Sequence, residues 1–79
     1  MTGYELERYI VDEIEYERKR QGVTITELSE RSSIAKSTYY QWIEKKKTPG
    51  LSALACVLRV LGLRLRITRK AVYENDRNR

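Results

Sequence analysis

Residues 51–61 are apolar around nearly the whole circumference of a helix, and this feature limits the possible folds most strongly. Nine of these eleven side chains are apolar, and the exceptions are Ser52 and Arg59. Such a helix has to be covered on more than one side. A chain of 79 residues is near the lower size limit for one hydrophobic core. We therefore expect the domain to cover one side of this helix and a second subunit to cover Val57 and Val60, with Cys56 as a further candidate.

A long helix over residues 3–21 is indicated by its ends and by its apolar stripe. Thr2 and Glu5 have the spacing of a capping box, in which each side chain bonds the other residue's backbone N–H. Gly22 is placed to end the helix in a left-handed conformation. Apolar residues recur about every four positions, as expected for one buried face. The stripe consists of Leu6, Tyr9, Ile10, Val11 and Ile14.

Two shorter helices follow. Thr24 and Glu27 repeat the capping-box spacing and begin a helix over residues 25–31. Serines at 32 and 33 mark a break, because serine side chains compete for backbone hydrogen bonds. A third helix is expected from Ala35 or Lys36 to Glu44, before the loop at residues 45–50. Together the segments predict an all-α bundle of four to five helices.

A short C-terminal β-strand is predicted by alternation after Gly62. Apolar Leu63, Leu65 and Ile67 alternate with polar residues at 64, 66 and 68, the period of a strand. No earlier segment offers a partner, so we expect pairing with the same strand of another copy, which removes an open edge. Two alternatives stay open: a hairpin with residues 71–73, and an extension packed on its own domain.

The two short helices and the serine turn between them have the pattern of a helix-turn-helix motif. Such a motif places its second helix in the major groove of DNA and holds it from behind. The predicted buried side is Ile34, Tyr39 and Trp42. Lysine can donate to guanine, glutamine can pair with adenine, and serine suits either base. The predicted base-reading residues are Lys36, Ser37, Tyr40 and Gln41; the alternative for each is a position in contact with phosphate or water alone.

Contacts with the DNA backbone are predicted on both sides of these residues. The N-terminus of the helix at 25–31 offers free amides and a favourable dipole to a phosphate. The lysine run at 45–47 follows the second helix directly, and the chain has 16 Lys and Arg against 11 Asp and Glu, a net charge of +5. A basic excess favours polyanions through counterion release. The predicted phosphate contacts are Thr24, Thr26, Thr38, Lys45, Lys46 and Lys47.

Other function classes find little support in the residue types. The chain has no His and one Cys, Cys56, which excludes His-based triads and most zinc sites. We therefore expect no enzyme activity, metal or cofactor. Cys56 is expected to be a buried small hydrophobe, and a lone cysteine fits a reducing cytoplasm. No apolar run approaches the ~20 residues of a membrane span, and acidic residues interrupt residues 1–14, so neither a membrane segment nor a signal peptide is expected.

The stretch GVTITELSERSSIAKSTYYQWIEKKKTPGLSALACVLRVLGL, residues 22–63, resembles the Cro and repressor type of helix-turn-helix protein, the XRE family. The resemblance extends back to about Ile14, and Arg18 falls where the family often has Arg. It implies a lambda-repressor-like bundle, base reading by the residues named above, and operators with two half-sites. The matching elements are Gly22-Val23-Thr24, Glu27-Leu28, Ile34, Ser37-Thr38, Trp42, Thr48-Pro49, Leu51, Leu54 and Leu61-Gly62.

Five positions depart from the family pattern. Ser33 stands where the family usually has Gly in the turn, and Lys45 where Gly often follows the second helix. Ile25 replaces a Gln that holds a phosphate in the family, Ser29 replaces a packed Ala, and Ile43 replaces a common acidic residue. These differences bear on individual contacts and not on the fold.

The sequence thus predicts a dimeric, sequence-specific repressor that binds double-stranded DNA in the cytoplasm. Its expected parts are a DNA-binding domain at 1–62, a dimerisation segment at 63–73 and a disordered tail at 74–79. Residues 61–68, LGLRLRIT, also resemble the end of the HigA- and HipB-type antitoxins, which implies an antitoxin with a toxin protein as partner. A third alternative is an interaction module that has lost DNA binding.

Overall fold

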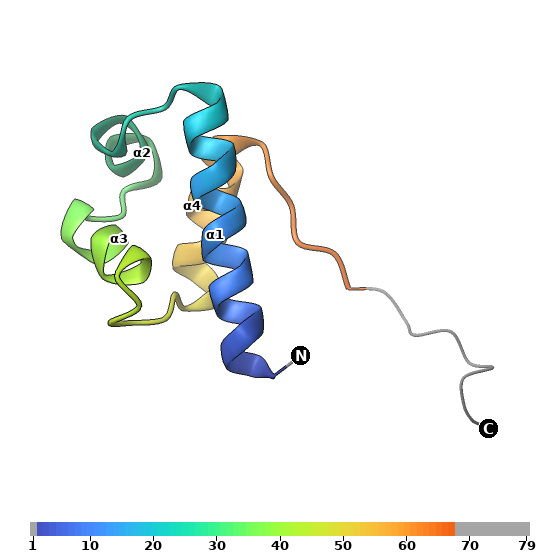
Figure 1. Cartoon of the computed structure of the whole chain (residues 1–79). Coiled ribbons are helices and arrows are strands. Elements are labelled where there is room, and N and C mark those ends of the chain that lie inside the picture. The colour runs from blue at the N-terminus through green and yellow to red at the C-terminus, as the bar shows by residue number, and fades with distance from the viewer. Residues whose placement is uncertain (1, 68–79) are drawn as a thin grey trace.

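The computed structural model describes residues 2–67 and contains four helices in this range. Figure 1 shows α2 and α3 together on one side of α1, with α4 behind α1. The expected all-α fold is confirmed, with the smaller of the two expected helix numbers. None of the described helices combines the length and apolarity needed to cross a membrane. The helices are α1 (Gly3–Gln21), α2 (Ile25–Ser32), α3 (Lys36–Ile43) and α4 (Leu51–Leu61).

The predicted helix ends are present. Thr2 and Thr24 each accept a hydrogen bond from the backbone N–H three residues on, and Glu5 and Glu27 accept one from the two threonine amides. Gly22 ends α1 with a φ of 72°, a conformation that costs glycine little. Since these signals are local, the helix bounds agree with expectation to within one residue.

The core lies between the four helices, and each of them contributes to it. Four side chains are almost completely buried: Ile14 of α1, Leu28 of α2, Tyr39 of α3 and Val57 of α4. Helix α4 packs against α1 and α2, and α3 packs against α1 and α2. The rest of the buried apolar core is Val11, Val23, Trp42, Leu54, Leu58 and Leu61.

Val57 was expected to face a second subunit, and this expectation is wrong. Its exposed fraction is 0% within the single chain, because α1 and α2 both pack against α4. Val60 and Cys56 are half-buried, so Cys56 is less enclosed than expected. The domain thus covers more of its most apolar helix than the sequence pattern indicated.

The apolar stripe of α1 is buried only in part. Ile14 and Val11 are buried, but Leu6 is 46% exposed and Tyr9 is 54% exposed. At 1.5 Å per residue, the 19 residues of α1 span about 28 Å, whereas the 11 of α4 span about 16 Å. The N-terminal turns of α1 therefore extend beyond the helices that bury its other half (Figure 1).

The predicted strand is not formed within residues 63–67. Leu63 donates its backbone N–H to Leu58 and is half-buried, and the segment then continues without regular secondary structure. The physical reason is that a strand needs a partner, and the described part of the chain offers none. The rest of the expected dimerisation segment, residues 68–73, and the expected tail at 74–79 lie outside the described residues.

Candidate nucleic-acid interface

The turn between α2 and α3 is held by its two serines. Ser33 has a φ of 62° and donates its backbone N–H to Ser29. Ser32 is buried; its hydroxyl donates to the carbonyl of Leu28 at 2.6 Å and accepts from the N–H of Ile34 at 3.2 Å. The chain therefore keeps the left-handed turn that the family makes with Gly, at a cost of about 1–2 kcal/mol for a residue with a Cβ.

Two aromatic side chains hold α3 against the domain. Tyr39 and Trp42 are each 2% exposed, and their ring centroids lie 5.7 Å apart with the planes tilted by 60°. Ile34, just before α3, is partly buried against the same core. Tyr40, by contrast, is 46% exposed. The expected division, with Tyr39 inside and Tyr40 outside, is confirmed.

The four predicted base-reading residues share one face of α3. Lys36, Ser37 and Tyr40 are exposed and Gln41 is half-buried. At about 100° of rotation per residue, the four directions fall within an arc of about 140°, and Tyr39 and Trp42 lie on the opposite side. The polar face of α3 therefore points away from the side that packs in the core, as a helix that enters the major groove requires.

The start of α2 offers two backbone amides and a hydroxyl. Thr24 is exposed, and its Oγ accepts from the N–H of Glu27 at 3.0 Å, which leaves the hydroxyl proton available. No hydrogen bond occupies the amides of Ile25 and Thr26 within the described residues. The Glu27 carboxylate lies at the same helix end, and its hydrogen bonds to Thr24 lower its pKa. Any phosphate bound here therefore approaches beside a negative charge.

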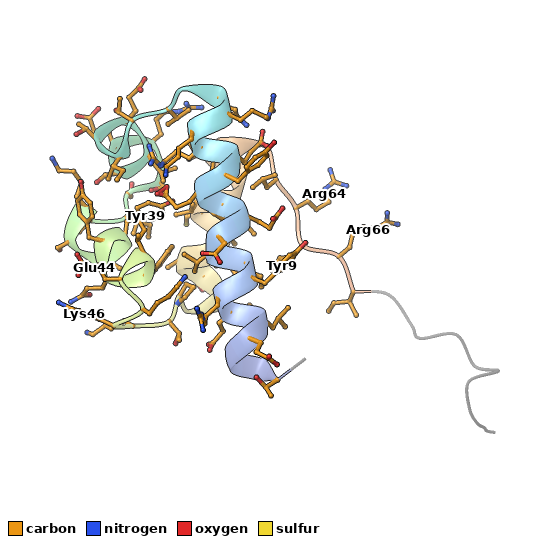
Figure 2. The ribbon with its side chains drawn as sticks, viewed as in Figure 1. Tyr9, Tyr39, Glu44, Lys46, Arg64 and Arg66 are labelled. Carbon is orange, nitrogen blue, oxygen red and sulfur yellow. The ribbon has the colours of Figure 1, made fainter. Side chains whose placement is uncertain are left out.

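The three lysines after α3 are not equivalent. Lys45 has a φ of 64°, and its Nζ lies 3.1 Å from a carboxylate oxygen of Asp12 in α1. Lys46 pairs with Glu44 at 3.3 Å, and both of these side chains are exposed at the end of α3 (Figure 2). Lys47 is exposed and makes no ion pair with another described residue. Lys45 thus ties this loop to α1, while Lys46 and Lys47 extend the basic surface beyond α3.

Lys36 and Thr38 complete the predicted contacts. The Lys36 Nζ lies 3.4 Å from the hydroxyl oxygen of Thr26, so the first turns of α2 and α3 meet at these two side chains. Thr38 is half-buried. The structure brings the α3 face, the start of α2 and the lysine loop to one side of the molecule (Figure 1).

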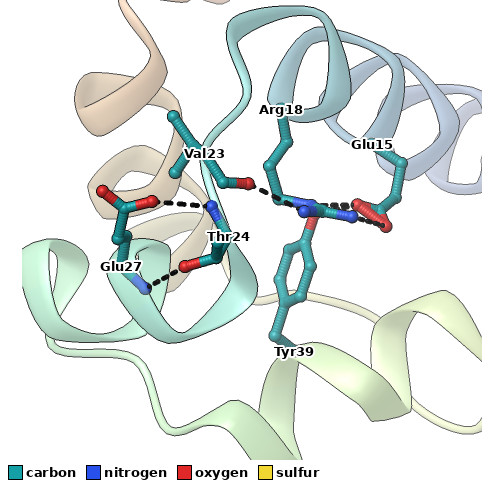
Figure 3. A network of polar contacts seen from close by, with 6 residues as sticks. All are labelled: Glu15, Arg18, Val23, Thr24, Glu27 and Tyr39. Atoms are coloured by element: carbon teal, nitrogen blue, oxygen red, sulfur yellow. Dashed lines mark hydrogen bonds and ion pairs between the residues drawn. The ribbon is translucent and has the colours of Figure 1, made fainter.

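A hydrogen-bond network behind α3, which the sequence patterns did not indicate, joins three parts of the fold (Figure 3). Arg18 donates to the Glu15 carboxylate through Nε at 2.5 Å and through a terminal nitrogen at 3.1 Å. Its other terminal nitrogen donates to the carbonyl of Val23 at 2.8 Å, just before α2. The Tyr39 hydroxyl lies 3.1 Å from the same Glu15 carboxylate. One carboxylate and one guanidinium thus connect α1, the start of α2 and the helix with the base-reading face.

The electrostatics of this network favour its charged form. Burial raises the pKa of Glu15, but the hydrogen bonds and charge of Arg18 outweigh burial, and the net pKa is lowered. Burial and the adjacent Glu15 carboxylate raise the pKa of the Tyr39 hydroxyl, which therefore stays protonated and donates. The available signal was the i, i+3 spacing of Glu15 and Arg18; that Tyr39 joins them depends on tertiary packing.

Groups suited to other chemistry are few in the described part of the chain. Between residues 2 and 67, no cluster of three or more His, Cys, Asp or Glu side chains is placed to hold a metal ion. Cys56 is a half-buried free thiol on α4.

Comparison with known proteins gives one match. A family model described as Helix-turn-helix matches residues 14–67, a range that includes all of α2, α3 and α4. No curated protein and no solved structure matches the chain.

Proposed function

The chain belongs to the XRE-type helix-turn-helix family of DNA-binding transcription regulators, and from this premise we propose that it is a sequence-specific repressor acting as a dimer. The observation that carries the proposal is the division of α3 into two sides. Tyr39 and Trp42 anchor one side in the core, and Lys36, Ser37, Tyr40 and Gln41 occupy the other. An anchored helix with a polar outer face suits the major groove.

In this proposal the bases are read by α3 and the phosphates are held around it. Lys36 and Ser37 address guanine or either base, Gln41 addresses adenine, and Tyr40 contacts a thymine methyl or a phosphate. The amides at the start of α2 and the lysine loop set the register of the domain on the duplex. The proposed phosphate contacts are Thr24, Thr26, Thr38, Lys45, Lys46 and Lys47, with Lys45 the least available because of its pairing with Asp12.

The dimer follows from the size of the reading surface. One short helix reads only a few base pairs, and two copies about 34 Å apart would place their α3 helices in successive major grooves and occlude a promoter. Leu63, Leu65 and Ile67 remain the proposed interface, with Val60 at its edge; Val57 is withdrawn because it is buried. A bacterial or phage operator in the cytoplasm is the proposed target, and the proposal includes no catalysis and no cofactor.

The test begins with selection of bound duplexes from a random pool, which should return a two-fold symmetric consensus. On that site, Gln41→Ala should reduce discrimination at one base pair of each half-site by about 1–3 kcal/mol. Lys46→Ala should weaken specific and random duplexes alike and reduce the slope of log K against log salt by about 1.

Arg59→Ala is the matched control, since it removes one exposed positive charge from α4 and leaves the α3 side unchanged. It should shift affinity less than Lys46→Ala. If no duplex binds at low salt, the chain is an interaction module and the proposal is wrong. If Gln41→Ala and Lys46→Ala act identically on specific and random DNA, the assignment of base and phosphate contacts is wrong.

An antitoxin role is the second candidate. The observation in its favour is the set of exposed apolar side chains on the side away from α3, including Leu51 at 80% and Ile67 at 101% exposed. A toxin protein could cover this side while DNA binding regulates the shared operon. A small toxin gene beside this one, with a toxin that forms a stable complex with the purified chain, would favour this role over a simple repressor.

A further inference from the structure

An apolar groove on the side of the domain away from α3 gathers most of the large apolar side chains that the fold leaves exposed. Within the described residues seven such side chains are exposed, and five of them line this groove: Leu6, Tyr9, Leu51, Leu65 and Ile67. Single exposed apolar residues are ordinary on protein surfaces, but a contiguous patch marks an interaction site. The groove lies between the N-terminal half of α1, the start of α4 and the segment 63–67.

The family match does not account for one wall of the groove. Leu6 and Tyr9 precede residue 14, where the match begins, and they belong to the turns of α1 that extend beyond the core. Tyr9 projects from α1 on the side where Arg64 and Arg66 lie (Figure 2). This wall therefore lies outside the part of the chain that matches the helix-turn-helix family.

The other wall is the segment 63–67, most of whose backbone groups and apolar side chains find no partner among the described residues. Leu65 is 50% exposed and Ile67 is 101% exposed, although both border an apolar surface. The backbone of residues 64–67 makes no hydrogen bond to another described residue. Gln21 donates to the carbonyl of Leu61 at 2.7 Å and Arg31 to that of Val60 at 3.4 Å, so the end of α4 is tied down and the segment leaves it in a set direction.

The charged residues that line the groove have opposite signs, Glu7 on α1 and Arg66 on the segment 63–67, and the two segments as wholes also differ in charge. Residues 3–13 contain four carboxylates (5, 7, 12 and 13) and one arginine (8), a formal charge of −3. The segment 63–67 contains Arg64 and Arg66 and no acidic residue, a charge of +2. Glu7 and Arg66 both line the groove, yet neither forms an ion pair with a residue in the described range 2–67. Complementary charge on two walls selects a partner that presents the same pair of surfaces.

We propose that the segment 63–67 of a second copy takes the place of the chain's own segment against α1 and α4, in a reciprocal exchange about a two-fold axis. Each copy then places Leu65 and Ile67 between α1 and α4 of its partner, and its Arg66 beside the partner's Glu7. A single two-fold axis fills the groove of each copy with the segment of the other, so the assembly is closed at two copies. The inference rests on the proposed dimer and assigns its surface. The segment 63–67, which lines the groove, and α3 lie on opposite sides of α1 (Figure 1), so both DNA-reading faces stay free.

The test compares Leu51→Glu with Tyr16→Glu by sedimentation equilibrium of the full chain without DNA. Leu51 is 80% exposed and lines the groove, whereas Tyr16 is 67% exposed on α1 and does not. The native chain should be a dimer. Leu51→Glu should raise the dimer Kd by more than about tenfold, because it places an unpaired charge in an apolar interface. Tyr16→Glu should leave the Kd near the native value.

Charge reversal in the groove provides a second, independent measurement. Glu7→Arg and Arg66→Glu should each dissociate the homodimer, because each brings like charges together twice. An equimolar mixture of the two variants should form a heterodimer, since both contacts are then Arg to Glu. Both residues line the groove and neither belongs to the buried core, so neither change needs to disturb the core.

Three outcomes overturn the proposal: a native chain that stays monomeric at all concentrations, a Leu51→Glu variant that dimerises like the native chain, or a charge-reversed mixture that stays monomeric. A monomeric chain whose complex with a toxin protein is abolished by Leu51→Glu assigns the groove to that partner instead. DNA binding is scored separately on a half-site duplex. A dimer that binds no DNA contradicts the proposed DNA binding and leaves the exchange standing. A monomer that binds a half-site contradicts the exchange and the proposed dimer and leaves the DNA binding standing.

Discussion

Replacing Tyr39 with Phe removes one oxygen atom from the network behind α3 and changes little else. The ring stays in the core, where Tyr39 is 2% exposed, and the hydroxyl lies 3.1 Å from the Glu15 carboxylate. A hydrogen bond to a charged group contributes about 1.5–3 kcal/mol. Because the same carboxylate keeps both bonds from Arg18, we expect a loss near the lower limit, about 1.5 kcal/mol. For a domain of this size that corresponds to a fall in Tm of about 6–12 °C.

The assay is urea unfolding followed by far-ultraviolet circular dichroism, with Tyr16→Phe as the matched control. Tyr16 is the neighbour of Glu15 on α1 and is 67% exposed, so losing its hydroxyl should change stability by less than about 0.5 kcal/mol. A double-mutant cycle with Glu15→Gln should give a coupling energy of about 1 kcal/mol between positions 15 and 39. Equal unfolding midpoints for Tyr39→Phe and Tyr16→Phe, or a coupling energy near zero, would refute the reasoning.

Two further predictions concern the turn between α2 and α3 and the loss of stability at low pH. Ser33→Gly should stabilise the domain by about 1 kcal/mol, because glycine adopts a φ of 62° without the Cβ penalty; an unchanged or lower urea midpoint would contradict this. The pKa of Glu15 is lowered on folding, and that of Glu17 is lowered to about 2 by hydrogen bonds from Arg20 and Gln21. A carboxyl whose pKa is lowered on folding contributes stability above its ordinary pKa of 4.5, and this contribution is lost as the pH falls through the folded pKa. Thermal melts should therefore show a constant Tm from pH 7 to about 5 and a decline below about 4.5. The decline should be shallower in Glu15→Gln, and identical slopes in the two proteins would contradict the contribution of Glu15.

Much of the fold follows from short-range signals in the sequence. The capping boxes at Thr2 and Thr24 and the left-handed Gly22 act over three or four residues, so their effect does not depend on what packs around them. The spacing of Tyr39 and Trp42, three positions apart, likewise indicated which side of α3 is buried. Helical geometry places these two side chains on one side and the polar residues on the other. The helix ends and the candidate base-reading face could therefore be predicted.

Which surfaces contact one another was determined by tertiary packing, because periodic patterns in the sequence carry no information about it. Val57 is buried and Leu6 is exposed, although both lie on apolar faces, because α1 is longer than the helices it packs against and α4 is covered on two sides. The bond between Tyr39 and Glu15 joins residues 24 positions apart, a distance over which only the folded chain determines proximity. The strand expected at 63–68 also depended on a partner, because a strand forms only when its backbone pairs with a second segment. Local pattern thus determined the elements, and the relative lengths and contacts of those elements determined the core, the network behind α3 and the open groove.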